Sequence, residues 1–208
     1  MTAPSEHRAI ISDWTARIVV GILFGLLSIN LLTDFTHTRR LTGLWMLISE
    51  LLVLVMTVLR RRTRIVDRSL LTAIVTGLSL TGPSLVRVAT NQALVPDFVT
   101  GLVSSIGLLI VIAGKFTLGR SFGIVPANRG VVMVGPYTVV RHPIYAGYLL
   151  THLAFACANA TLWNVVILLL ADTALVIRSR REERLLALDH SYQTYCQRVA
   201  WHLVPGLY

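Results

Sequence analysis

The segment Gly135–Gly147, GPYTVVRHPIYAG, stands directly before a long apolar run. It gathers an arginine, a histidine, a proline and two tyrosines at the edge of sequence that is otherwise compatible with lipid. Guanidinium and imidazole groups can donate charge-assisted hydrogen bonds to carboxylates, and a tyrosine ring attracts cations. Such side chains beside an apolar helix either anchor that helix at the membrane interface or hold a polar ligand.

Two further polar segments lie on either side of this motif. Lys115–Gly123, KFTLGRSFG, precedes it, and Arg178–Gly206, RSRREERLLALDHSYQTYCQRVAWHLVPG, follows the apolar run. The last segment carries the paired glutamates Glu182 and Glu183. If the chain returns to the same side of the membrane after the apolar run, the motif and the glutamates meet at one membrane face. The sequence then predicts a single polar site built from distant segments.

Taken together, these motifs resemble the isoprenylcysteine carboxyl methyltransferase family, part of a wider group that includes the phospholipid methyltransferases. The likeness runs from about Leu118 to Gly206 and comprises, in order, G-x-Y, R-H-P-x-Y-x-G, E-E, Y-x-x-Y and a proline. It implies a membrane methyltransferase that uses S-adenosylmethionine. The family's cofactor pocket is cytoplasmic and lies between the R-H-P-x-Y segment and the helix with the paired glutamates.

The resemblance also implies roles for individual residues. Arg141 or His142 would bind the carboxylate of the cofactor, a glutamate would accept from its amino group or ribose, and the Tyr145 ring would lie against its sulfonium. Tyr192 and Tyr195 match the tail motif and either close the pocket or pack a peripheral helix. Carried over by position, the catalytic candidates are Arg141 and Glu183, and the cofactor-binding candidates are Tyr137, Val140, His142, Tyr145, Gly147, Glu182 and Glu183.

Each of these residues also has a simpler interpretation. Arginines next to apolar runs mark the cytoplasmic face of membrane proteins, and tyrosines form belts at the interface. The glutamates could pair with neighbouring arginines on a helix surface. The order and spacing of the motifs favour the site.

The methyl acceptor is lipophilic or small, and its class stays open. Arg120 is the candidate for orienting an anionic acceptor and is the third catalytic candidate. Eukaryotic prenylcysteine enzymes carry an arginine in the helix before the motif, whereas Gly107–Gly114, GLLIVIAG, has none. This argues against a prenylated cysteine and leaves a small thiol, a phospholipid amine or another lipid acid.

A second class of enzyme shares part of the pattern. Membrane sterol reductases carry similar G-x-Y and R-H-P-x-Y stretches and bind a nicotinamide cofactor. An NADPH-dependent membrane reductase is therefore the alternative. The paired glutamates followed by Y-x-x-Y, and the short chain, favour the methyltransferase.

The composition is that of a membrane protein. Hydrophobic residues make up 54% of the 208 residues and charged residues 14%, against ~25% charged in soluble domains. The net charge of +9 comes from arginines that stand between apolar runs, which indicates membrane topology and anionic headgroups rather than nucleic acid. The two cysteines, Cys157 and Cys196, suggest neither a disulfide framework nor a metal site, and the N-terminus does not read as a removed signal peptide.

The apolar pattern predicts an all-α, polytopic membrane bundle in a single domain, 1–208. Asn159 lies near the middle of the last apolar run, which spans about 32 residues and ~48 Å as a helix. Because the hydrocarbon core is only ~30 Å thick, this run is expected to fold as a helical hairpin. Pro83 should kink or end the third span. The expected elements are four spans at about 14–32, 41–59, 69–89 and 98–118, hairpin arms at 144–158 and 162–177, and a cytoplasmic tail helix; the bundle covers 14–118 and the cofactor-binding part 119–208.

The distribution of basic residues supports this topology. With a cytoplasmic N-terminus, all but three of the nineteen basic residues (Arg39, Arg40 and Arg87) lie inside, as the positive-inside rule requires. A single crossing of the last run would move five more of them outside. The active site is thus expected on the cytoplasmic face of a multi-pass protein of the bacterial inner-membrane type, surrounded by membrane lipids; no oligomeric state follows from the sequence.

Two ionisable residues fall inside predicted spans. Glu50 lies in the middle of the second span, where a lone charge costs at least ~2.5 kcal/mol. It is expected to face the bundle, to be protonated or to pair with another span. His152 lies within the hairpin and is either functional or a neutral histidine bonded to a neighbouring helix.

Overall fold

The computed structural model describes isolated positions between 14 and 36, then residues 41–61, 63, 66–67, 69–87, 89 and 93–208, without the side chains of 41–47 and 50. Within these residues all regular structure is helical, apart from one antiparallel bridge between Val66 and Ala127. The predicted first span, Arg39, Arg40 and the Glu50 side chain fall largely or wholly outside this set. The α-helices are α2 (Leu41–Leu59), α3 (Leu70–Thr81), α4 (Asp97–Leu118), α5 (Pro143–Ala158), α6 (Leu162–Leu186) and α7 (His190–Arg198), and the 3-10 turns are η1 (Gly82–Leu85), η2 (Gly119–Ser121) and η3 (Gly135–Thr138).

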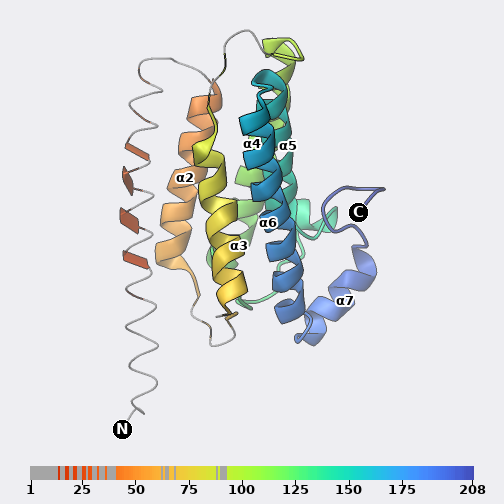
Figure 1. Ribbon diagram of the computed structural model, residues 1–208. Coiled ribbons are helices and arrows are strands. Elements are labelled where there is room, and N and C mark those ends of the chain that lie inside the picture. Colours follow the sequence, from red (N-terminus) through yellow and green to blue (C-terminus); the bar gives the residue numbers. More distant parts are fainter. Residues whose placement is uncertain are drawn as a thin grey trace.

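Helices α2 to α6 run side by side as a bundle, and α7 lies at one end of it (Figure 1). α4 packs along both α5 and α2, and α3 packs along α6. The crossing of α4 and α5 is close because two glycines face each other there. A Cβ added to Gly147 would stand 2.5 Å from the carbonyl oxygen of Gly107, so only glycine fits at this contact.

The third apolar segment ends as expected. Ser69 caps α3 through the backbone N–H of Thr72, and the α-helix stops at Thr81. Pro83 then falls in the 3-10 turn η1, because proline lacks the N–H that an α-helix interior needs. The predicted interruption is confirmed.

The predicted hairpin is present as two helices, and its second arm is longer than expected. α5 ends at Ala158, the chain turns at Asn159, and the Thr161 hydroxyl accepts from Asn164 N–H to start α6. α6 then continues past Ile177 to Leu186. The second arm was predicted to end at Ile177 because the apolar run ends there, and this end was wrong. The polar sequence that follows, RSRREERLL, is rich in strong helix formers and continues the helix. The paired glutamates therefore lie on the same rigid helix as the apolar arm.

Among the described residues, two helical stretches are long and apolar enough to cross a membrane, Asp97–Ser121 and Leu162–Leu186. Leu70–Leu85 and Pro143–Ala158 are apolar but shorter. Many large apolar side chains on these helices are exposed, for example Phe98, Leu162 and Leu169. Such an outward apolar surface is typical of a membrane protein.

At the far end of the bundle from α7, polar contacts hold the turn regions together. The Asn164 side chain accepts from the N–H of Arg87 and donates to its carbonyl oxygen. The guanidinium of Arg87 lies 4.9 Å from the centre of the Trp163 ring. Arg87 therefore has a structural role, because it holds this turn region to the start of α6.

Candidate cofactor site

The R-H-P-x-Y motif forms a turn followed by the start of α5, and the C-terminal tail fixes this turn in place. Arg141 and His142 donate their backbone N–H groups to the carbonyl oxygens of Trp201 and His202, at 2.9 and 3.0 Å. Pro143 occupies the first turn of α5, where no backbone donor is needed. The tail thereby sets the His202 ring against the His142 ring, with 4.6 Å between their centres.

One carboxylate oxygen of Glu183 is the centre of the site. Its Oε1 atom lies 3.2 Å from Arg141 Nε, 3.5 Å from His142 Nε2 and 3.0 Å from His202 Nδ1. Tyr192 also donates its hydroxyl to this oxygen at 3.0 Å. We call Glu183 and these four residues the Glu183 cluster; it joins the motif, α6, α7 and the tail.

Two donors of the cluster are close to Glu183 without a properly directed hydrogen bond. Arg141 Nε and His142 Nε2 are buried and have no hydrogen-bond partner within the described part of the chain. Burial works against the Arg141 charge, but the Cys196 thiol and Glu183 outweigh it and raise the pKa of Arg141. A buried charged donor of this kind is costly unless a ligand completes its bonding. The cluster therefore has spare donor capacity for an anionic group.

The two tail tyrosines act as hydrogen-bond donors in the site. Burial, helped by the negative charge of Glu183, raises the pKa of Tyr192 well above its usual range, so its hydroxyl stays protonated. Burial likewise raises the pKa of Tyr195, which donates to the backbone oxygen of Tyr137 at 2.6 Å. Both rings are buried and pack with Val199 against Val131 and Leu186. Both tyrosines also line the chamber described below.

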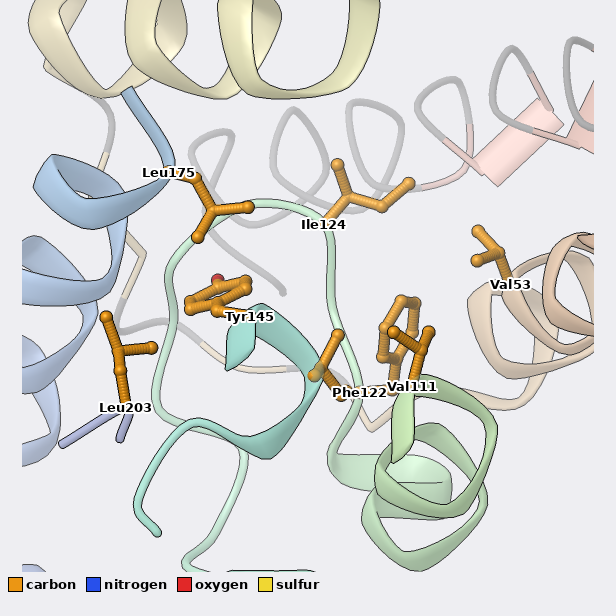
Figure 2. Close-up of a cluster of buried hydrophobic side chains, with 8 residues drawn as sticks. Val53, Val111, Phe122, Ile124, Tyr145, Leu175 and Leu203 are labelled. Carbon is orange, nitrogen blue, oxygen red and sulfur yellow. The ribbon is translucent and has the colours of Figure 1, made fainter. Parts of the chain in front are cut away.

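Tyr145 belongs to the cluster of buried apolar side chains in the core (Figure 2). Its hydroxyl donates to Glu182 Oε2 at 2.7 Å. Its ring is stacked with the His142 ring at 5.3 Å between centres, and the Arg178 guanidinium lies 5.3 Å from its centre. Because the ring already holds one cation, its fit to a sulfonium is poorer than the motif suggested.

A cavity of about 1150 Å³ extends from this site into the bundle. Arg141, His142 and Glu182 line its polar end, whereas Glu183 lies behind that wall. Most of the side chains that line the rest come from α3, α4, α5 and α6 and are apolar, among them Leu80, Leu108, Ile144, Leu168 and Leu175. Asp97, His152 and Asn159 also line it. One chamber thus joins a charged end to an apolar interior.

Several predicted site residues lie at or near this chamber and others do not. Tyr137, Arg141, His142, Tyr145, Glu182, Tyr192 and Tyr195 line it. Val140 is buried beside it, and Gly147 lies at the crossing with α4. Arg120 is exposed, donates to the carbonyl oxygen of Leu59 at 3.2 Å and does not line the chamber, because the chain leaves α4 through η2 and turns the side chain toward α2.

The sequence argument missed two residues of the site. His202 carries one of the closest contacts to Glu183, and its other ring nitrogen lies 2.8 Å from the Ser179 hydroxyl. Arg178, expected only to mark a membrane face, is buried in α6 and donates to Ser79 and to the backbone oxygen of Ile124. The histidine within AWHLVPG was a visible signal, whereas nothing in the sequence separates Arg178 from its neighbours.

The nitrogens of His142 and His202 and the Glu183 carboxylate are grouped closely enough to suggest a metal site, with ligand atoms within 4.8 Å of one another. The Arg141 guanidinium, 3.2 Å from the same carboxylate oxygen, argues against this use because it would face a divalent cation at close range. Tyr192 and His202 already contact that oxygen at 3.0 Å each. The geometry favours a hydrogen-bonded cluster.

Comparison with protein families agrees with this arrangement. Residues 93–193 match the model of the phospholipid methyltransferase family. The match runs from just before α4 into α7 and includes the R-H-P-x-Y motif, the hairpin, both glutamates and Tyr192. This region of the chain is thus similar to the phospholipid methyltransferase family, which stands within the wider group of membrane methyltransferases that includes the isoprenylcysteine carboxyl methyltransferases.

Proposed function

We propose that this protein is an integral membrane methyltransferase that uses S-adenosylmethionine and methylates a lipophilic or small acceptor at the cytoplasmic membrane face. The observation that carries the proposal is the Glu183 cluster at the polar end of a chamber whose other walls are mostly apolar. A water-soluble methyl donor needs the polar end of such a site, and a lipid acceptor needs its apolar walls. The family match supports the reaction class.

The residues at the polar end suit the amino-acid part of the cofactor. Arg141 and His142, the donors without directed partners, are available to bind its carboxylate. The Glu182 carboxylate lines the chamber and uses only its Oε2 atom for Tyr145, so it is free to accept from the amino group. Glu183 lies behind them and holds Arg141 and His142 in position. We therefore assign contact with the cofactor to Glu182 and a positioning role to Glu183.

The rest of the chamber suits methyl transfer. The bound cofactor supplies an electrophilic methyl group on a sulfonium. The protein must hold the acceptor in line with that methyl and keep water away from it. Apolar walls from α4, α5 and α6 exclude water. A lipid acceptor would reach them from the bilayer between the α3–α6 pair and the α4–α5 pair, which share few contacts.

The proposed topology has four spans, the α5–α6 hairpin and a cytoplasmic tail helix. Its support is the distribution of arginines and the two apolar stretches in α4 and α6. Single cysteines at Ser191 and Thr161, in a background with both natural cysteines replaced by serine, test it. A membrane-impermeant maleimide should label the two positions from opposite sides. Labelling of both from one side would reject the hairpin topology.

Ligand binding to the purified full-length protein in detergent tests the activity class. Calorimetry should detect S-adenosylmethionine and not NADPH. Glu182→Gln should weaken the first ligand, whereas His190→Gln, a change on the exposed side of α7, should not. Binding of NADPH alone would replace the proposal with the reductase alternative.

A further inference from the structure

His152 and Asp172 form a close polar pair inside the helical hairpin, away from the Glu183 cluster. His152 Nδ1 lies 2.5 Å from Asp172 Oδ1, joining the middle of α5 to the middle of α6. His152 is buried with 9% of its surface exposed. Ionisable side chains at such depth are costly, and they mark functional sites more often than structural ones.

The pair faces the same chamber as the proposed cofactor site. His152 lines the chamber together with Tyr148, and their rings are stacked 6.3 Å apart. In a neutral imidazole, the contact with Asp172 places the proton on Nδ1. The other nitrogen, Nε2, then carries the lone pair, and it has no hydrogen-bond partner among the described residues. This is the arrangement of a general base that a carboxylate holds in one tautomer.

The position along α5 suits that role. His152 lies seven positions after Tyr145 in α5, a rise of about 10 Å. The reacting atoms need about 3–3.5 Å between them, and a hydrogen bond from the acceptor to Nε2 adds about 3 Å. A nucleophile held beside Tyr148 could therefore face the methyl donor on one side and His152 on the other.

We propose that His152, oriented by Asp172, is a catalytic residue that binds the acceptor and removes its proton. The inference rests on the proposed methyltransferase function. It restricts the acceptor to a nucleophile that carries a proton, an amine or a thiol, since a carboxylate arrives ionised and needs no base. In the step, the acceptor nitrogen or sulfur forms a bond to the methyl carbon and the carbon–sulfonium bond breaks. The electron pair of that bond stays on the donor sulfur, and the acceptor proton moves to His152 Nε2.

The charged and titratable groups around His152 are few. Asp172 on α6 touches it, and Tyr148 stacks beside it with Lys115 of α4 across the Tyr148 ring. Asp97 at the start of α4 lines the same chamber. The chamber walls from α3 and η1 contribute Ser79, Leu80 and Pro83, none of which titrates.

The test uses the full-length protein in detergent with three probe acceptors: dioleoylphosphatidylethanolamine vesicles, dodecanethiol and oleate. The wild type should methylate the amine or the thiol. His152→Gln should reduce that rate by about 10²- to 10⁴-fold and leave the affinity for S-adenosylmethionine within about twofold. Asp172→Asn should also lower the rate, because the amide no longer holds the imidazole in one tautomer. His190→Gln, an exposed histidine on α7, is the matched control.

A second measurement does not depend on turnover or on the folding of the His152 variant. In the wild-type protein labelled with ¹⁵N-histidine, one imidazole should be an Nδ1–H tautomer that changes in Asp172→Asn. The Nε2 signal of the same ring should shift when dodecylamine is added.

The outcomes separate this inference from the proposed function. Wild-type turnover in His152→Gln, loss of cofactor affinity in that variant, methylation of oleate alone, or an imidazole signal insensitive to Asp172→Asn would each overturn the role of His152. Failure of the wild type to bind S-adenosylmethionine would instead count against the methyltransferase itself.

Discussion

Replacing Glu183 by glutamine tests the central contact of the site with the smallest change in shape. The carboxylate oxygen that meets Arg141, His142, His202 and Tyr192 becomes an amide that carries no charge. Tyr192 and His202 can still donate to the amide oxygen. Arg141, however, loses its only anionic partner within the described part of the chain.

The size of the effect follows from this loss. A hydrogen bond to a charged group contributes about 1.5–3 kcal/mol, and each 1.4 kcal/mol changes a binding constant about tenfold. If Arg141 is no longer held toward the chamber, the affinity for S-adenosylmethionine should fall by about 10- to 150-fold. The thermal midpoint should fall less than for a core deletion, because the backbone bonds between the motif and the tail remain.

Calorimetry and thermal unfolding of the same detergent-purified samples provide the assay. Asp189→Asn is the matched control, because it also turns a carboxylate into an amide in the tail while Asn remains a good helix cap. Wild-type affinity in Glu183→Gln would refute the positioning role. An equal loss of affinity in the Asp189 control would refute the specificity of the effect.

Three further predictions concern packing, pH and the acceptor. Gly147→Ala should lower the free energy of unfolding by about 1–3 kcal/mol through overpacking against Gly107. Gly101→Ala, whose Cβ meets nothing within 4 Å, should be neutral or stabilising. Equal thermal midpoints for the two variants would contradict the close crossing of α4 and α5. Burial lowers the pKa of His202 below 6.5 despite the bond to Glu183, so the folded state binds fewer protons than the unfolded state just below pH 6.5. The contribution of His202 to stability is therefore present above that pH and is lost as the pH falls through the folded pKa. His202→Gln should flatten a scan of thermal midpoint between pH 7.5 and 5. Arg120→Gln should leave turnover with any probe acceptor within about twofold, since the side chain is exposed and outside the chamber; a loss confined to anionic acceptors would restore the role suggested by the sequence.

The motif sequence predicted much of the site because its residues have few other uses together. R-H-P-x-Y and the paired glutamates flank a run too long for one helix, so a turn at Asn159 was required. The proline and the capping residues set the helix starts locally. These are effects of neighbouring residues, and a sequence contains them directly.

The sequence alone determined four features: a composition typical of a membrane protein, the break in the third apolar segment, the hairpin, and most of the polar residues of the candidate site. Only the tertiary structure decided which of two adjacent glutamates lines the chamber, that His202 and Arg178 join the site, that Arg120 points away from it, and that His152 meets Asp172. The physical reason is that these pairings depend on the rotation of α5 against α6 and on the path of the C-terminal tail. Those arise from the packing of whole helices, for which no single stretch of residues carries the information.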